Sequence, residues 1–342
     1  MVLNVRKGLT FDDVLLVPKY STIDSRKNID VSVDLGKGVK LSIPIISANM
    51  KNITELNMAL KIAEMGGLAI LHRFYDNPLH DQLSVFYEVI KVNPKYINHV
   101  GVSIGVQDSD FEQVCEFVQH GIKIICLDIA HAHSAAAGEM VSKIKANYPN
   151  VLLIAGNVST AEAFTFLAKA GADVIKSGVG AGSICTTRIE TGNGVPQLTA
   201  LSECYQVMDR IFPNVKIIAD GGIKAAGDLT KCLCFSHAVM LGNLLAGTDE
   251  APGETTYIDG KSYKSYNGSS TFKKDHIEGV SALVPIKGPV ENVINKLLQG
   301  LKSGCSYQGV DNLQDLKEYP EFISVTNAGL IESRAHDVIV VK

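Results

Sequence analysis

A glycine-rich loop around one cysteine has residue types that suit covalent chemistry. Residues 178–197 read GVGAGSICTTRIETGNGVPQ, so closely spaced glycines precede Cys185. Glycines let backbone N–H and C=O groups approach a ligand closely. Ser183, Thr187 and Arg188 surround Cys185 with polar groups and a cation, a setting that favours a reactive thiolate. The alternative is a buried structural cysteine, but the polar neighbours favour a nucleophile.

Two later turns carry residues that suit a nucleotide phosphate. One turn contains Asp220, Gly221 and Gly222, and the other contains Gly242 and Asn243. Backbone N–H groups after the seventh and eighth strands of a barrel commonly form a phosphate site. The Asp220 carboxylate could accept hydrogen bonds from ribose hydroxyls, or it could merely cap its turn. Together the two turns predict a bound nucleotide.

Polar residues also end other apolar runs. Asp128 and Asn157 could orient the amide of a cofactor or a reacting group. His72 and Arg73 could meet the substrate or a loop, with an exposed surface pair as the alternative.

These residues need a scaffold, and the chain offers a repeated one. Short runs rich in Val and Ile recur at residues 43–50, 68–73, 99–105, 122–130, 151–158, 172–180, 216–223 and 238–246. Their continuous apolar character is typical of strands buried on both faces. Segments with helical spacing alternate with them at residues 54–66, 110–121, 135–148, 160–171 and 226–236, and a last one covers residues 289–304. Eight strand–helix units predict an α/β fold, the (β/α)8 TIM barrel, as one domain over residues 1–342. A pair of Rossmann-like domains is less consistent with the chain, because no G-x-G-x-x-G follows the first run.

Two long connections leave the carboxyl ends of predicted strands, where barrels build their active sites. They cover residues 180–215 and 247–289. The second contains a predicted flap, residues 263–284, in which Tyr266, Ser269 and Ser270 could hold phosphate or base edges. Glu278 could carry a proton over the cysteine, although by composition alone it reads as a solvated charge.

The overall composition argues against several classes of partner. A net charge of −4 gives no basic footprint for nucleic acid or an anionic membrane. The apolar runs are far shorter than the roughly 20 residues that a membrane helix needs. The first residues lack the pattern of a signal peptide, and seven cysteines at irregular spacing favour a reducing cytoplasmic compartment.

Several of these segments resemble one family. The resemblance to the IMP dehydrogenase/GMP reductase family lies in GSICTTR at 182–188, LTFDDVLLVPK at 9–19, IADGGI at 218–223, LAGTDEAPGE at 245–254 and YKSYNG at 263–268. These motifs occur in the family's order along most of the chain. The resemblance implies a TIM barrel, usually a homotetramer, that binds a purine 5′-monophosphate and a nicotinamide cofactor.

The resemblance also implies roles for individual residues. Cys185 matches the nucleophile that attacks purine C2, and Thr187 and Glu278 match its proton-transfer partners. Phosphate-binding positions are matched by Ser183, Gly222, Gly242, Asn243 and Tyr266, and the ribose position by Asp220. Base-contacting positions are matched by Met50, Ser269, Ser270 and Gly279. Positions near the nicotinamide are matched by Asp128, Asn157, Lys176 and Gly178. Carbonyls at Gly180, Gly182 and Cys185 match a monovalent cation site, which suggests potassium.

Two absences favour the reductase branch of the family, in which NADPH reduces GMP to IMP and ammonia through a cysteine thioimidate. Dehydrogenases use an Arg-Tyr pair on a long flap to hydrolyse their intermediate. Here seven residues separate Ser270 from Glu278, and no Arg-Tyr pair occurs. Residues 74–98 also leave no room for the regulatory insertion that dehydrogenases usually carry. An IMP dehydrogenase without that insertion is the nearer alternative, because GVPQLTA at 194–200 resembles dehydrogenases. A non-catalytic purine-nucleotide sensor is the other.

Overall fold

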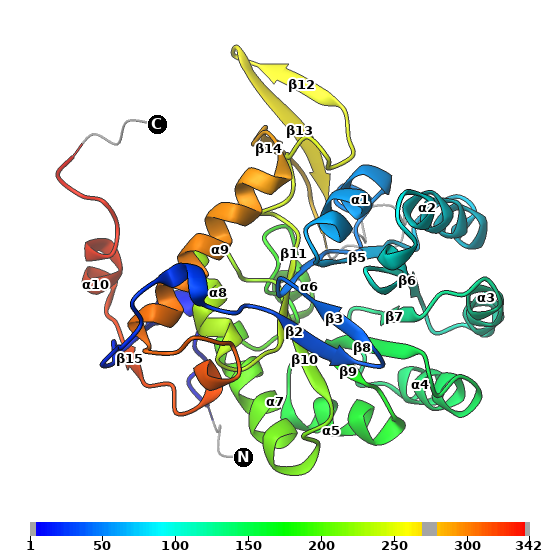
Figure 1. Ribbon diagram of the computed structural model, residues 1–342, viewed down its shortest axis with the longest axis horizontal. Coiled ribbons are helices and arrows are strands. Elements are labelled where there is room, and N and C mark those ends of the chain that lie inside the picture. Colours follow the sequence, from blue (N-terminus) through cyan, green and yellow to red (C-terminus); the bar gives the residue numbers. More distant parts are fainter. Residues whose placement is uncertain (1–4, 269–278, 339–342) are drawn as a thin grey trace.

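The computed structural model describes residues 5–268 and 279–338 and has a closed barrel of parallel strands at its centre (Figure 1). In chain order the barrel strands are β4 (Ile45–Ser47), β5 (Leu68–Leu71), β6 (Val100–Ile104), β7 (Ile124–Asp128), β8 (Leu152–Val158), β9 (Val174–Ser177), β10 (Lys216–Asp220) and β11 (Ala238–Leu241). Each lies inside one of the eight predicted runs. The barrel closes because β11 pairs with β4, in the register Val239↔Ile45, which confirms the TIM barrel and excludes two open sheets.

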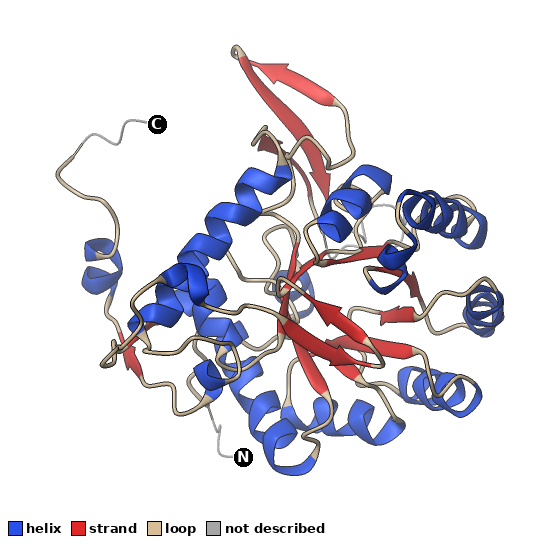
Figure 2. Ribbon diagram, viewed as in Figure 1, coloured by secondary structure: helices blue, strands red, loops and turns tan. Residues whose placement is uncertain are grey.

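The strands are buried on both faces, which explains their continuous apolar sequences. Every residue of β5 and β6 is buried. Because successive side chains of a strand point to opposite faces of the sheet, both faces of these strands are buried. The helices surround the barrel strands (Figure 2), and the buried side chains of strands and helices form one hydrophobic core.

The outer helices are α1 (Leu56–Glu64), α2 (Pro78–Val92), α3 (Asp108–Gln119), α4 (Ala135–Asn147), α5 (Ala161–Ala170), α7 (Gln197–Ile211), α8 (Ala226–Leu233) and α9 (Val290–Tyr307). Local chemistry sets their ends: in α5 the Thr160 side chain accepts from the N–H of Ala163, and Gly171 ends the helix in the left-handed conformation. One expectation needs correction. The connection over residues 180–215 is not a loop throughout, because α7 occupies its second half.

The second long connection forms a small antiparallel sheet rather than an open loop. It consists of β12 (Thr255–Ile258), β13 (Lys261–Asn267) and β14 (Ser281–Pro285), drawn in yellow to orange at the edge of the barrel in Figure 1. Lys264 on β13 ties this sheet to the chain after β11, because its Nζ donates to the carbonyls of Thr248 and Ala251. The described residues at both ends of the predicted flap therefore belong to paired strands, β13 and β14.

The remaining elements lie outside the barrel. They are η1 (Phe11–Asp13), β1 (Val14–Leu16), η2 (Arg26–Asn28), β2 (Val33–Gly36), β3 (Val39–Leu41), η3 (Pro94–Asn98), α6 (Thr187–Thr191), η5 (Asp315–Lys317), β15 (Phe322–Ser324) and α10 (Asn327–Glu332). Strands β1 and β15 pair with each other, so segments near the two ends of the chain lie side by side (Figure 1). Among the described residues, no helix has the length and apolar character needed to cross a membrane.

A buried lysine at the end of η5 makes stability depend on pH. Lys317 is 7% exposed, and its Nζ donates to the Leu313 carbonyl. Burial lowers the pKa of Lys317 to about 8 from 10.5. Since this folded-state pKa lies below the unfolded one, the unfolded chain binds more protons between the two values, and stability rises with pH across that range.

We expect Lys317→Met to raise the free energy of unfolding at pH 7 by about 1–3 kcal/mol, because it removes a charge that folding must bury. The variant should also lose the rise in stability between about pH 8 and pH 10.5 that the parent protein shows. Urea unfolding at pH 7, 8.5 and 10 measures both effects. Lys296→Met, at an exposed position of α9, is the control and should change neither. A Lys317→Met variant that is destabilised at pH 7 and keeps the alkaline rise contradicts this account.

Candidate active site

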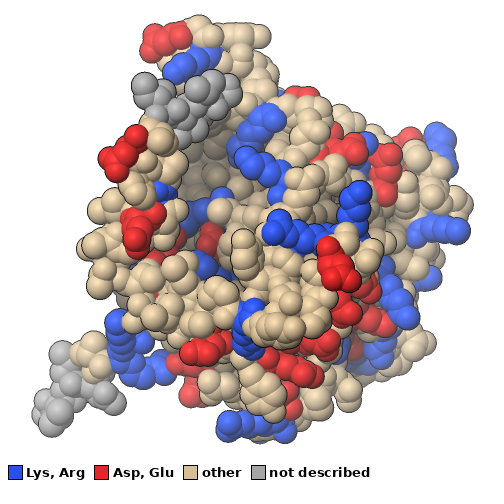
Figure 3. Space-filling view, turned by 60° about the vertical axis from the view of Figure 1, so that its left-hand side comes forward, with Lys and Arg blue, Asp and Glu red and all other residues tan. Residues whose placement is uncertain are grey.

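A cavity of about 420 Å³ opens at the carboxyl ends of the barrel strands. It opens as a hollow in Figure 3, with acidic and basic side chains within it and at its rim. Its lining includes the predicted residues Met50, Asp128, Asn157, Lys176, Gly178, Gly180, Gly182, Cys185, Thr187, Asp220, Gly221 and Tyr266. Residues from widely separated parts of the chain therefore converge on one site.

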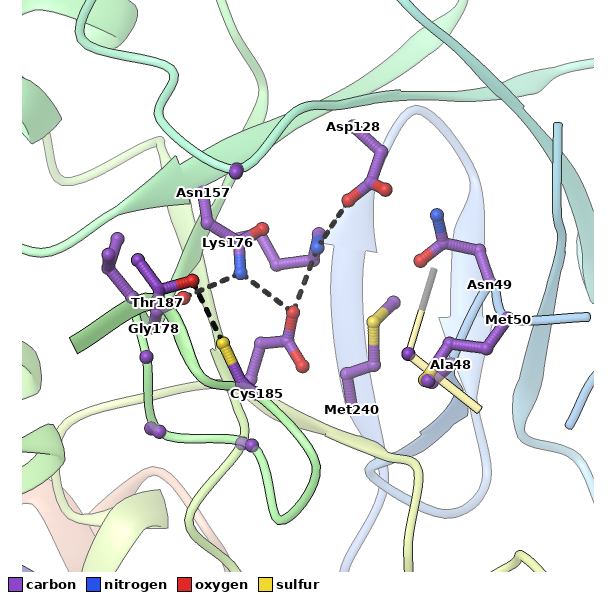
Figure 4. Close-up of a pocket in the computed structure, with 18 of the residues that line it drawn as sticks. Ala48, Asn49, Met50, Asp128, Asn157, Lys176, Gly178, Cys185, Thr187 and Met240 are labelled. Atoms are coloured by element: carbon purple, nitrogen blue, oxygen red, sulfur yellow. Dashed lines mark hydrogen bonds and ion pairs between the residues drawn. The ribbon is translucent and has the colours of Figure 1, made fainter. Parts of the chain in front are cut away.

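A buried lysine joins three strands at the floor of the cavity. The Lys176 Nζ on β9 lies 2.8 Å from Asp128 Oδ1 on β7 and 2.8 Å from Asp220 Oδ2 on β10 (Figure 4). Burial alone lowers the pKa of Lys176, but the two carboxylates outweigh it and hold that pKa above its usual value. For Asp128, burial favours the neutral acid, and Lys176 overcomes it so that the pKa is lowered. Lys176 and Asp128 are therefore both charged at neutral pH.

Amide side chains extend this network towards the cysteine loop. The Asn157 Nδ2 donates to the Gly178 carbonyl at 2.7 Å and to Asp220 Oδ2 at 2.9 Å. The Gln197 Nε2, at the start of α7, donates to the Ser177 carbonyl at 2.8 Å and to the Asp220 carbonyl at 3.1 Å. The ends of β9 and β10 are thus held in contact where the loop begins.

The loop holds Cys185 beside Thr187, at the mouth of the barrel. The Cys185 Sγ lies 3.0 Å from the Thr187 Oγ1, which is close enough for proton exchange between the thiol and the hydroxyl (Figure 4). Arg188 was expected to act as a cation near the thiol. Its guanidinium instead donates to the carbonyls of Val179 and Val195, so it braces the two ends of the loop.

The chain after the predicted flap returns to this loop. Gly279 forms an antiparallel bridge with Cys185, and the Val280 N–H donates to the Ile184 carbonyl at 3.2 Å. Three predicted flap residues, Ser269, Ser270 and Glu278, lie outside the described residues. Gly279, the first described residue after them, lies beside the cysteine.

The predicted phosphate residues are brought together only in part. Tyr266 is buried and lines the cavity. Burial has the largest effect in raising the pKa of its hydroxyl, and the negative charge of Asp220 raises it further. A methyl group added at Gly242 would lie 2.9 Å from the Tyr266 hydroxyl, so these two residues are in contact. The cavity lining does not include the other described positions, namely Gly242 itself, Ser183, Gly222, Asn243 and Gly279. Asn243 turns its carbonyl to the Lys287 Nζ.

Sequence reasoning missed several lining or supporting residues. Asn49, Phe74 and Met240 line the cavity, as does Arg73, which the sequence had left undecided. His72 is fully buried, so the alternative of an exposed surface pair is wrong for it. The rule that polar residues at strand ends reach the site would have found Asn49. No comparable signal marks Met240.

The proposed cation position consists of backbone carbonyls in a tight turn. The Gly182 carbonyl accepts the Cys185 N–H at 3.2 Å, so one of its lone pairs is in use and the other remains for a cation. Across the described part of the chain, no cluster of three or more His, Cys, Asp or Glu side chains offers a metal site of another kind. All seven cysteines are free thiols.

Comparisons with known proteins point to one family. The family model for the IMP dehydrogenase / GMP reductase domain matches residues 8–336. An inosine-5′-monophosphate dehydrogenase of Aquifex aeolicus is 34% identical over 478 residues, covering 99% of this chain and 97% of that protein. The Cryptosporidium parvum enzyme of the same name is 36% identical over 400 residues, covering 99% and 97%. Among solved structures, a GMP reductase from Trypanosoma brucei in complex with guanosine 5′-monophosphate has a TM-score of 0.86 at 29% identity, covering 98% of this chain and 99% of that one.

We expect Gly178→Ala to disrupt the start of the cysteine loop. Gly178 has a φ of +153°, and an added methyl group would lie 1.9 Å from the Asp220 carbonyl oxygen. The backbones of β9 and β10 must then separate, with a loss of at least about 2 kcal/mol in the free energy of unfolding. Gly121→Ala is a matched control, because Gly121 also has a positive φ, of +85°, but nothing within 4 Å of the added methyl. Only backbone strain of about 1 kcal/mol applies there. Equal losses in urea unfolding would show that the close approach to Asp220 is unimportant.

Proposed function

Because the chain belongs to the IMP dehydrogenase / GMP reductase family of oxidoreductases, we propose that it is a GMP reductase, which converts GMP to IMP and ammonia with NADPH. The observation that carries this proposal is the short flap. Strand β13 ends at Asn267 and Gly279 already bridges to Cys185, so little chain lies between. The sequence has no Arg-Tyr pair there or elsewhere, and a dehydrogenase of this family needs that pair to activate water.

In this proposal, GMP binds with its phosphate on the glycine turns after β10 and β11. Asp220 accepts from the ribose, and Met50 contacts the base. The phosphate ligands are Ser183, Gly221, Gly222, Gly242, Asn243 and Tyr266. Ser269, Ser270 and Gly279 contact the base from the flap. The position of Tyr266 over Gly242 supports this arrangement, because both then meet the same end of the ligand.

Cys185 is the proposed nucleophile. Its thiol proton passes through the Thr187 hydroxyl, 3.0 Å away, to Glu278, and the thiolate sulfur adds to C2 of guanine. The same proton returns to the 2-amino group, the C2–N bond breaks, and ammonia leaves a thioimidate between C2 and the sulfur. Hydride transfer to C2 and breakage of the C–S bond then release IMP and restore the thiolate.

Asp128, Asn157, Lys176 and Gly178 would hold the nicotinamide of NADPH. When bound, the reduced nicotinamide supplies the hydride. The Asn157 Oδ1 supports this assignment, because it is buried without a hydrogen-bond partner among the described residues and can accept from a ligand N–H. A potassium ion would be held by the carbonyls of Gly180, Gly182 and Cys185.

We also propose that the chain acts as a single catalytic domain in a cytoplasmic homotetramer. Helix α2 begins at Pro78, soon after β5 ends at Leu71, which supports a barrel without a regulatory insertion at that point. The alignment with the Aquifex protein is longer than this chain, so that relative has segments that this chain lacks.

An IMP dehydrogenase activity is the second candidate. It is favoured by the names of the curated relatives in the comparison, at 29–36% identity. A nucleotide sensor without activity is less consistent with the site, because the contact between Cys185 and Thr187 serves chemistry and is not needed for binding.

The direct test follows absorbance of reduced nicotinamide in two reactions. We expect NADPH to be consumed with GMP, with one ammonia formed for each NADPH oxidised. With IMP, NAD and potassium, we expect no signal. A signal only in the second reaction would identify a dehydrogenase with a different water-activating base. Nucleotide binding without a signal in either reaction would support the sensor.

We expect Cys185→Ala to lower the rate of GMP reduction by at least about 10³-fold, because the covalent step is lost. GMP binding, measured by calorimetry, should change less than about threefold, since the phosphate and ribose contacts remain. Cys115→Ala on α3, outside the cavity lining, is the control and should retain full activity. Substantial turnover by the Cys185→Ala variant would rule out the covalent mechanism.

A further inference from the structure

One edge of the cavity is held by a buried histidine that the proposed mechanism does not use. His72 follows β5 directly and is 0% exposed. The next two residues, Arg73 and Phe74, line the cavity. In the barrel order, β5 is diametrically opposite β9, from which the cysteine loop leaves, so this edge faces the loop across the mouth.

A hydrogen bond to the backbone defines which ring nitrogen of His72 is the acceptor. The Phe74 backbone N–H donates to the Nδ1 at 3.1 Å, so the Nδ1 must carry a lone pair. The neutral ring therefore has its hydrogen on Nε2. That atom lies 3.6 Å from Glu55 Oε1 and is buried without a hydrogen-bond partner among the described residues.

Stacking fixes the plane of the ring. The ring centroids of His72 and Tyr75 are 3.8 Å apart at an interplanar angle of 23°. The Arg73 guanidinium lies over the Phe74 ring, 5.1 Å from its centroid. The imidazole thus shapes the turn through a backbone contact, and the turn places Arg73 and Phe74 in the cavity wall.

We infer that His72 is a positioning residue whose Nδ1, by accepting the Phe74 N–H, holds the Arg73–Phe74 edge in place for the dinucleotide. The inference rests on the proposed function for the identity of the ligand. The nucleotide monophosphate is proposed to bind mainly on β4 and β9–β11, which leaves the β5–β7 side to the dinucleotide.

Charged groups from two helices lie around this cluster. Glu55, from the start of α1, lies beside the His72 Nε2. Burial has the largest effect in raising the pKa of the Tyr75 hydroxyl, and the charges of Glu55 and of Asp81 on α2 raise it further. The Tyr75 hydroxyl therefore stays neutral. One carboxylate on α1 and one on α2 thus face the cluster on this side.

Two amide variants separate positioning from mere packing. In His72→Asn, the amide oxygen takes the place of Nδ1 and can accept from Phe74 without titrating. In His72→Gln, the amide lies nearer the place of Nε2 and leaves the Phe74 N–H without an acceptor. Binding of NADPH to the GMP-loaded Cys185→Ala protein, followed by nicotinamide fluorescence, measures the effect without turnover.

At pH 8, we expect NADPH to bind His72→Asn within about twofold of the parent and His72→Gln about tenfold more weakly, the effect of one lost hydrogen bond. GMP affinity should stay within about twofold in all variants.

Equal NADPH affinities for His72→Gln and His72→Asn at pH 8 would overturn the inference. Failure of the proposed function has a different signature. In that case the parent protein would not consume NADPH with GMP, whichever residue stands at position 72. If NAD then binds the IMP-loaded protein, the same variant series applied to NAD tests the histidine independently of the reaction.

Discussion

The salt bridges of Lys176 are the constraint on which the site depends. A buried ammonium is costly unless opposite charges compensate it, and removing one partner of such a pair typically costs about 3–5 kcal/mol. Asp128 and Asp220 provide that compensation from two other strands. Burial of Lys176 therefore requires that the ends of β7, β9 and β10 stay in register, so that both carboxylates reach the ammonium. The cavity floor and the fold are stabilised by the same contacts.

The position of the cysteine follows from this floor. With β9 and β10 held together, the chain at Gly178 passes so close to Asp220 that only glycine fits, and the loop must turn away. Arg188 then braces both ends of the loop, and Gly279 pairs with Cys185 itself. Cys185, the proposed nucleophile, thus lies on a loop whose position is set by contacts that involve no ligand. Such preorganisation is what a covalent step requires, because the sulfur must meet one ring carbon.

The sequence predicts the barrel well, because burial on both faces leaves an apolar signal in every strand. It also identifies the cysteine loop, since glycine density and polar neighbours are local properties. It does not show that Arg188 serves the loop backbone, that Gln197 joins two strand ends, or that His72 is buried. These facts depend on tertiary contacts between each side chain and carbonyls or rings from other parts of the chain. Local composition does not determine such contacts, because they form only when the barrel closes.

The relatives in the comparison carry two activity names, and the barrel accommodates both for a physical reason. In the mechanism proposed for this chain, oxidation of IMP and reductive deamination of GMP share one intermediate, a purine bound through C2 to sulfur. Its fate depends on whether hydride or water reaches C2 first. The described groups of the cavity floor, Lys176, Asp128 and Asp220, are bonded to one another. We propose that the flap decides this competition, because dehydrogenases of the family carry their water-activating Arg-Tyr pair there. This sequence has no Arg-Tyr pair, which under the proposed function favours hydride transfer over hydrolysis.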